Sequence, residues 1–264
     1  MKEEKEMSDF FSTQNVVVNA NHGIIIGGNV YGGVVTNDGI CFPGTFPDEL
    51  HMKTRTYNKE YTAGGSAVKS LSIEADFPVH FETGDAFSIK MIGKETGTRK
   101  LSPSISFYGG RCDFCVRGDD GFASRSTVEI FVTLPKCRMD EVNLVSQTGD
   151  LYLSLSKETS IRKFGYQTTS GRVVMRRAGS ISELDINGTN INVMIAVDLF
   201  CDTKIQIKSV SGDVNILLVN TKKINVKSRM TNGYADVQQP DRRGENTADI
   251  SIEMTSGSAV IEGK

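Results

Sequence analysis

Residues 205–217 read IQIKSVSGDVNIL, and this stretch decides the fold. Two short segments, Ile205-Gln206-Ile207 and Val214-Asn215-Ile216, alternate apolar and polar side chains on either side of a Ser-Gly-Asp turn at residues 211–213. Alternation with a period of two places the apolar side chains on one face of a strand. Glycine permits the backbone angles that a tight turn requires. The stretch therefore predicts two strands, each buried on one face, around a glycine turn.

The same pattern recurs through the second half of the chain. Further copies are residues 143–153 (NLVSQTGDLYL), 166–174 (YQTTSGRVV), 224–237 (INVKSRMTNGYADV) and 250–261 (ISIEMTSGSAVI), with a degenerate copy at 184–193 (LDINGTNINV). The turn glycines are Gly149, Gly171, Gly212, Gly233 and Gly257. A recurrence about every 21 residues is typical of coiled repeat folds, in which each unit buries its apolar face only against its neighbours.

The repeats predict an all-β protein. We expect a single-chain coiled β-solenoid over residues 68–264, with strands about 4.8 Å apart and the five glycines at one corner of successive rungs. A glycine-rich β meander and a long loop at residues 43–64 make up residues 16–67, and residues 1–15 form an N-terminal tail. A β-sandwich with regular hairpins is the alternative, because hairpins also give a strand–turn–strand pattern.

Composition and charge narrow the classes of partner. A net charge of −2 and a pI near 6.0 provide no basic field for nucleic acid or anionic lipid. No stretch is long and apolar enough to span a membrane. The first 15 residues lack the apolar region of a secretory signal, and five widely spread cysteines fit a reducing compartment. We therefore expect a cytoplasmic protein, or a surface protein if the chain was trimmed, with no nucleic-acid partner and no membrane insertion.

Four segments together resemble a known family. They are FPVHFETGDAFSIKMIG (residues 77–93), STVEIFVTLPK (126–136), VNLVSQTGDLYL (142–153) and SVSGDVNI (209–216). The series is similar to the bacterial "putative adhesin" β-solenoid family, a domain of unknown function in which a strand with a V-x-I-x-L-P phrase precedes repeated S-G-D-V rungs. The resemblance covers residues 68–262. It implies the fold, and it brings no catalytic residue and no cofactor.

Cys112 and Cys115 form a C-x-x-C motif. Zinc sites usually pair two such motifs or add histidines at fixed spacing, and neither follows here. On a strand the two side chains point to opposite faces, and only a tight knuckle after Gly109-Gly110 would bring them together. We therefore predict no structural metal and no disulfide, with Cys112 or Cys115 buried as an ordinary side chain.

Other motifs are read as surface features. Arg117-Gly118-Asp119 is the integrin tripeptide, but its glycine-rich and acidic surroundings predict an exposed hairpin tip. Asp119 and Asp120 are too few to fill the oxygen shell of a calcium ion. The three histidines, His22, His51 and His80, have no neighbouring pattern of a catalytic triad.

Asp150 and Asp213 occupy equivalent turn positions, where Arg172 and Asn190 also occur. Local hydrogen bonding beside glycine explains an aspartate there, and we can place no carboxylate pair for glycosidase chemistry. We hypothesise a non-enzymatic binding or scaffold module for an unknown protein or carbohydrate partner, with no catalytic residue, metal or cofactor. The alternatives are a carbohydrate-active β-helix enzyme and a self-assembling structural element.

The C-terminal repeat suggests a site of self-association. Only Glu262-Gly263-Lys264 follow the rung at residues 250–261, too few residues to cover its edge. An uncovered strand edge invites pairing with another chain. We therefore expect this rung to be the open end of the stack and to join two or more molecules through residues 247–262.

Overall fold

Two units make up the chain, Met1–Met52 and Lys53–Lys264. The computed structural model describes residues 53–63, 68–97, 100–117, 125–240 and 244–264, together with four short strands in the first unit. In that unit β1 (Val17–Val18) pairs antiparallel with β2 (Ile24–Ile25), and β3 (Val34–Thr36) with β4 (Gly39–Cys41). The described part of the chain contains no helix of the length and apolar character needed to cross a membrane.

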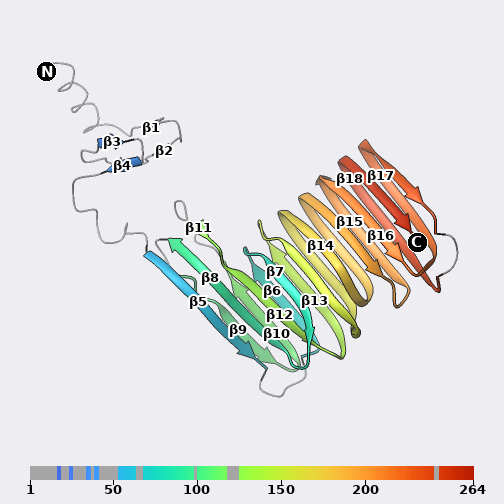
Figure 1. Ribbon diagram of the computed structural model, residues 1–264, viewed down its shortest axis with the longest axis horizontal. Helices are drawn as coiled ribbons and strands as arrows, with labels where there is room; N and C mark the ends of the chain where they lie inside the picture. Colours follow the sequence, from blue (N-terminus) through green and yellow to red (C-terminus); the bar gives the residue numbers. More distant parts are fainter. Residues whose placement is uncertain are drawn as a thin grey trace. The chain divides into compact units, whose positions relative to one another are not determined.

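The second unit is one 14-stranded sheet, drawn from blue to red in Figure 1. Its strands are β5 (Lys53–Thr62), β6 (Ser70–Ala75), β7 (Val79–Gly84), β8 (Ser88–Gly97), β9 (Ser104–Tyr108), β10 (Arg111–Val116), β11 (Arg125–Ser126), β12 (Glu129–Pro135), β13 (Arg138–Ser146), β14 (Leu151–Asp198), β15 (Thr203–Ser211), β16 (Asp213–Val219), β17 (Thr221–Gln238) and β18 (Asn246–Gly263). Every described element is a strand, so the protein is all-β as predicted.

Alternating side chains build the interior. In β6, burial alternates strictly, with Leu71, Ile73 and Ala75 inside. Parallel register places Leu71 between Cys112 of β10 and Val142 of β13, and all three are buried. Because parallel pairing superimposes equivalent positions, each buried side chain lies on buried neighbours in the next strand, and one apolar column runs through the stack.

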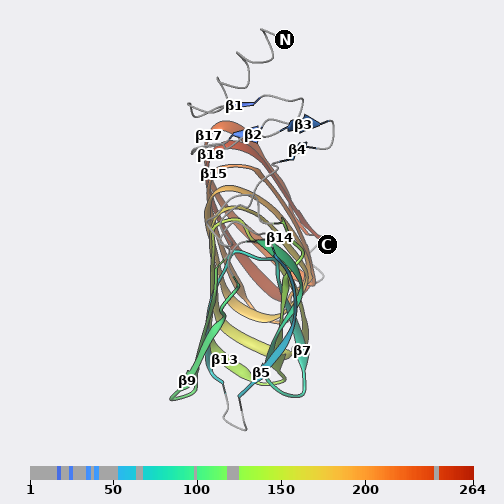
Figure 2. The same cartoon turned by 90° about the vertical axis from the view of Figure 1, so that its left-hand side faces the viewer.

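β14 passes through several levels of this stack. Its partners, all parallel, are β7 at residues 151–154, β13 at 160–168, β15 at 183–190 and β16 at 193–198. Hairpins join antiparallel neighbours, so they do not account for this pattern. Figure 2 views the strands from one end and shows the chain passing around a narrow interior. We call one level of the stack a rung.

Antiparallel pairs also occur in this unit, around β8 and β9. β8 pairs antiparallel with β5, β11 and β12, and β9 pairs antiparallel with β10. Residues 53–62, expected to lie within a long loop, instead form β5, which pairs with β8 along its whole length. Buried Tyr57 fixes this strand, since its hydroxyl donates to Glu95 (3.1 Å) and accepts from the N–H of Leu101 (3.0 Å). Polar residues dominate KTRTYNKEYT, which explains why apolar alternation gave no signal there.

The C-terminal strand is not the end of the stack. β18 pairs in parallel with β15 and β16 on one side and with β17 on the other. The expectation that residues 250–261 form the open rung is therefore wrong, because β18 lies inside the stack and β17 is the outermost of the described strands. Figure 1 shows the two strands side by side. The connection between them includes Pro240, which is buried and contacts Gly263.

Candidate functional site

The turn glycines gather where successive rungs approach closely. They lie against one another in pairs, Gly171 on Gly149, Gly257 on Gly212 and Gly233 on Gly257. Gly212 packs on Ile191 of the degenerate copy, where an added Cβ would lie 1.9 Å from the Ile191 carbonyl oxygen. The order in space is Gly212, Gly257, Gly233, which differs from the order in sequence because β18 is inserted before β17.

The residue after each turn links one rung to the next. The bonds run from the Arg172 N–H to Asp150 Oδ1 (2.8 Å), from the Asp213 N–H to Asn192 Oδ1 (3.1 Å), and from the Ser258 N–H to Asp213 Oδ1 (3.2 Å). The aspartate of the S-G-D phrase therefore acts between rungs, whereas the sequence suggested bonding within its own turn. In the degenerate copy the side chain that accepts this bond is that of Asn192. Asn190, the residue expected at this position, is instead in register with Ser211. The reason is that Ile191, not Gly188, takes the place of the turn glycine under Gly212.

Three aromatic rings form a row on the outer face of the early strands. Phe131 of β12, His80 of β7 and Tyr152 of β14 are in direct register. The His80 ring lies 4.8 Å from Phe131 and 4.6 Å from Tyr152 between centroids, with interplanar angles of 13° and 6°. These separations match the spacing of hydrogen-bonded strands, so register alone stacks the rings. We call Phe131, His80 and Tyr152 the aromatic row.

A charged network closes the Tyr152 end of the aromatic row. The guanidinium carbon of Arg172 lies 5.7 Å from the centroid of the Tyr152 ring. Arg172 Nη2 donates to the Tyr152 hydroxyl (2.7 Å) and to Asp150 Oδ2 (2.9 Å). The Tyr152 hydroxyl in turn donates to Asp150 Oδ2 (3.1 Å). Partial burial, together with the bond to Asp150, raises the pKa of Tyr152, so its hydroxyl remains a donor at neutral pH. The network fixes both the ring and the guanidinium in one position.

His80 is the centre of the aromatic row, and among the described residues its buried Nε2 makes no hydrogen bond. The same Nε2 lies 3.5 Å from Oε2 of Glu129, within ion-pair distance. Sequence reasoning assigned His80 to ordinary surface. The row could not be recognised from the sequence, because Phe131, His80 and Tyr152 meet only through pairing between strands far apart in the chain.

The geometry of the aromatic row limits what it can contact. Both faces of the His80 ring are covered by neighbouring rings, and one face of Tyr152 lies under Arg172. At His80 and Tyr152 the row therefore presents ring edges, which carry partial positive charge, beside the Arg172 guanidinium. A sugar that stacks on an aromatic ring needs a free face. A protein surface can pack on edges and pair with arginine.

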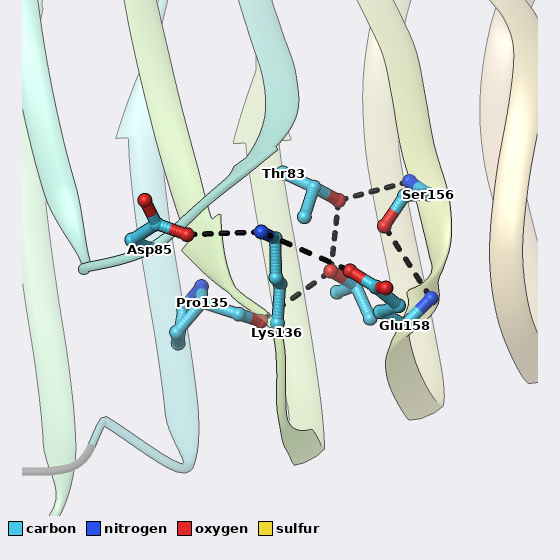
Figure 3. Close-up of polar contacts among 7 residues, drawn as sticks. Thr83, Asp85, Pro135, Lys136, Ser156 and Glu158 are labelled. Atoms are coloured by element: carbon cyan, nitrogen blue, oxygen red, sulfur yellow. Dashed lines mark hydrogen bonds and ion pairs between the residues drawn. The ribbon is translucent and has the colours of Figure 1, made fainter.

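A second polar cluster lies at another corner, where β7, β12 and β14 meet, as Figure 3 shows. The Thr83 hydroxyl is 2.8 Å from that of Thr159 and accepts from the Ser156 N–H (2.9 Å). Beside this pair, Lys136 Nζ lies 2.9 Å from Asp85 Oδ1 and 3.9 Å from Glu158 Oε2. The hydrogen bond from Lys136 lowers the pKa of Asp85. A general acid needs a raised pKa, so Asp85 does not have the character of one.

Cys112 and Cys115 both lie on β10, and the strand separates them. Cys112 faces the core, where burial raises the pKa of its thiol to about 12. Cys115 faces the other side, with its Sγ 3.6 Å from Glu74 Oε2. In the described residues no group of three or more His, Cys, Asp and Glu side chains is arranged to hold a metal ion.

These positions predict different thiol reactivity. We expect Cys112 to resist iodoacetamide in the folded protein at pH 8, because the thiolate is the reactive form and burial disfavours it. Exposed Cys137 should react within the same period. Mass spectrometry of native and urea-treated protein measures both sites. Equal labelling of Cys112 and Cys137 in the native state would show that β10 is not held in the core.

Several sequence motifs fall outside the described residues. His22, His51 and most of the Arg117-Gly118-Asp119 motif belong to this group. Arg117 itself is described, and its guanidinium pairs with the Glu74 carboxylate. The hypothesis of an exposed hairpin tip at residues 117–121 therefore stays a prediction.

The fold and the hydrogen bonds that link one rung to the next at the turns define a class of all-β proteins built from stacked, mostly parallel strands. The model of the Toastrack DUF4097 family matches residues 54–262, and the chain belongs to this family. The bacterial adhesin-like resemblance drawn from the sequence is thereby confirmed. A search of curated proteins finds no match.

Several solved structures also match much of this chain. A "putative cell adhesion protein" from Clostridium sporogenes is 12% identical, with a TM-score of 0.47, over 80% of this chain and 100% of that one. A "putative adhesin" from Bacteroides fragilis is 10% identical, with a TM-score of 0.44, over 80% and 97% of the two chains. A "putative adhesin" from Parabacteroides merdae is 11% identical, with a TM-score of 0.34, over 80% and 96%.

Proposed function

We propose that the chain is a non-enzymatic binding or scaffold module whose rungs form one β-solenoid and whose aromatic row contacts a protein partner. The observation that carries the proposal is the row itself, three rings in register with a fixed arginine beside them. Tyrosine and arginine dominate the energetic centres of protein interfaces. Because strands hold these side chains, little conformational entropy is lost when a partner binds.

The chemistry of the aromatic row favours a protein over a carbohydrate. The rings of His80 and Tyr152 are covered on both faces, by their neighbours in the row and by Arg172, so neither offers a sugar an open platform. A partner with carboxylates and small apolar side chains fits better, since carboxylates pair with Arg172 and apolar groups pack against the edges of Phe131 and Tyr152.

The rival carbohydrate-active enzyme has less support. Retaining and inverting glycosidases need two carboxyl groups free to act as acid and as nucleophile or base. Asp150 is held by Arg172 and Tyr152, and Asp213 accepts from both the N–H and the hydroxyl of Ser258. These bonds fit carboxylates that join rungs.

Site-specific crosslinking tests the proposed surface. A photo-crosslinking phenylalanine analogue at Phe131 should capture one main protein in native cells, and His80→Ala with Tyr152→Ala should lose it. The same analogue at exposed Arg162 of β14 is the matched control. An unchanged crosslink in the double variant, or the same product from position 162, would contradict the role of the row. Saccharide binding that Tyr152→Ala abolishes would support a carbohydrate partner instead.

A further inference from the structure

The outermost strand β17 leaves a long edge free on the described part of the stack. Among the described residues β17 pairs with β18 alone, from Thr221 to Gln238. The Gln239 side chain shows which side is open, because its amide accepts from the Ile224 N–H (3.3 Å) and donates to the Ile224 carbonyl (2.9 Å). These two backbone groups therefore point away from β18. Backbone groups alternate sides along a strand, so those of Val226, Ser228 and Met230 face the same open side.

The open edge is basic. Lys222, Lys223, Lys227 and Arg229 are all exposed on β17, and no acidic residue occurs between Thr221 and Ala235. Two interior side chains of this strand, Val226 and Met230, are only partly buried against the core. An additional strand would cover both features, with acidic side chains outside and apolar ones inside.

The neighbouring strands β15 and β18 show which charges suit a strand that lies beside β17. Glu253 of β18 lies in register between Lys208 of β15 and Arg229 of β17, with 3.7 Å between Lys208 Nζ and Glu253 Oε2. Four residues earlier, Asp249 accepts from Asn225 Nδ2 (2.7 Å). An acidic strand thus already lies between two basic ones, and β17 ends the alternation on a basic strand.

A second copy of this edge is a poor occupant. In an antiparallel pair centred on Lys227, this residue would face Lys227 of the other copy. A register shifted by two residues would bring Arg229 opposite Lys223. Like charges directly opposite destabilise strand pairs, and lysine on an edge is a known protection against self-pairing.

We propose that the edge of β17 binds an acidic extended segment of a partner protein as one more strand, with two carboxylates four residues apart. Backbone bonds to Val226, Ser228 and Met230 would hold the segment, as in other strand-addition complexes. The carboxylates would continue the charge columns of Asn225 and Arg229. The surface is separate from the aromatic row, so either proposal can fail alone.

Two synthetic peptides test the proposal on the full chain. The peptide TEVTVEVT has the required pattern, and TKVTVKVT is its basic counterpart. We expect the acidic peptide to bind at least about tenfold more tightly at low salt, with the difference reduced in 0.5 M salt. Fluorescence anisotropy measures both, and hydrogen exchange should show new protection at residues 226–230.

Three variants decide between outcomes. Lys227→Glu with Arg229→Glu should reverse the preference between the peptides, and Ser228→Pro should weaken both, because proline removes an outward N–H without breaking a bond to β18. Arg162→Glu, on an inner rung, is the control and should change nothing. Equal binding of the two peptides, or none at millimolar concentration, would overturn the proposal. So would dimerisation that Ser228→Pro abolishes, since the occupant would then be a second copy.

Discussion

Ending the chain at residue 245 is expected to abolish cooperative folding of the second unit instead of shortening it by one rung. β18 lies between β15 and β17, so its removal opens the stack and leaves β17 without a neighbour. Four large side chains leave the core with it: Ile250, Ile252, Met254 and Ile261. At about 1.5–3 kcal/mol each, their loss is comparable to the whole stability of a domain, about 5–15 kcal/mol. Circular dichroism during urea titration measures the effect.

Point variants separate this effect from general damage to the C-terminus. Ile252→Ala should lower the free energy of unfolding by about 2–5 kcal/mol, because Ile252 is 1% exposed between Ile207 and Ser228. Ser251→Ala, one residue away on the outer face, should change it by less than about 0.5 kcal/mol. A truncated chain with an unchanged cooperative transition would mean that β18 is a peripheral strand.

The sequence predicts the strands and turns of this fold but not the order of the strands in space. Alternating residues and turn glycines predict strands and turns because both depend on neighbours in the chain. The insertion of β18 before β17 depends on pairing between strands far apart in the chain, which no local pattern encodes. One signal was present: Lys227-Ser228-Arg229 interrupts the apolar alternation of β17, whereas Ile250-Ser251-Ile252 keeps it. The poorer pattern belongs to the strand that is exposed on one edge.

The candidate surfaces depend on register and were hidden for the same reason. His80 meets Phe131 and Tyr152 only when β7, β12 and β14 align, and the basic edge becomes an edge only when β17 is outermost. The hydrogen bonds between rungs at the turns could not be predicted for the same reason. Sequence reasoning found Asp150 and Asp213 but assigned them to their own turns, because the acceptor of a bond to the next rung lies more than 20 residues from its donor.

Gly212→Ala is the substitution expected to disturb the corner most. Gly212 has a φ of +130°, which L residues rarely adopt, and the new Cβ would meet the Ile191 carbonyl oxygen at 1.9 Å. Backbone strain alone costs about 1–3 kcal/mol, and relieving the clash must separate two rungs. Such a shift also displaces Asp213 from the N–H and hydroxyl of Ser258. We therefore expect a loss of at least about 3 kcal/mol in the free energy of unfolding, measured by urea denaturation.

Gly109→Ala is the matched control for this prediction. Gly109 also has a positive φ, +57°, but no atom lies within 4 Å of an added Cβ. Alanine there should cost only the left-handed backbone conformation, about 1–2 kcal/mol. The difference between the two variants isolates the close approach of rungs from the backbone angle. Equal losses would mean that glycine serves the turn conformation alone, and that the corner does not set how closely the rungs stack.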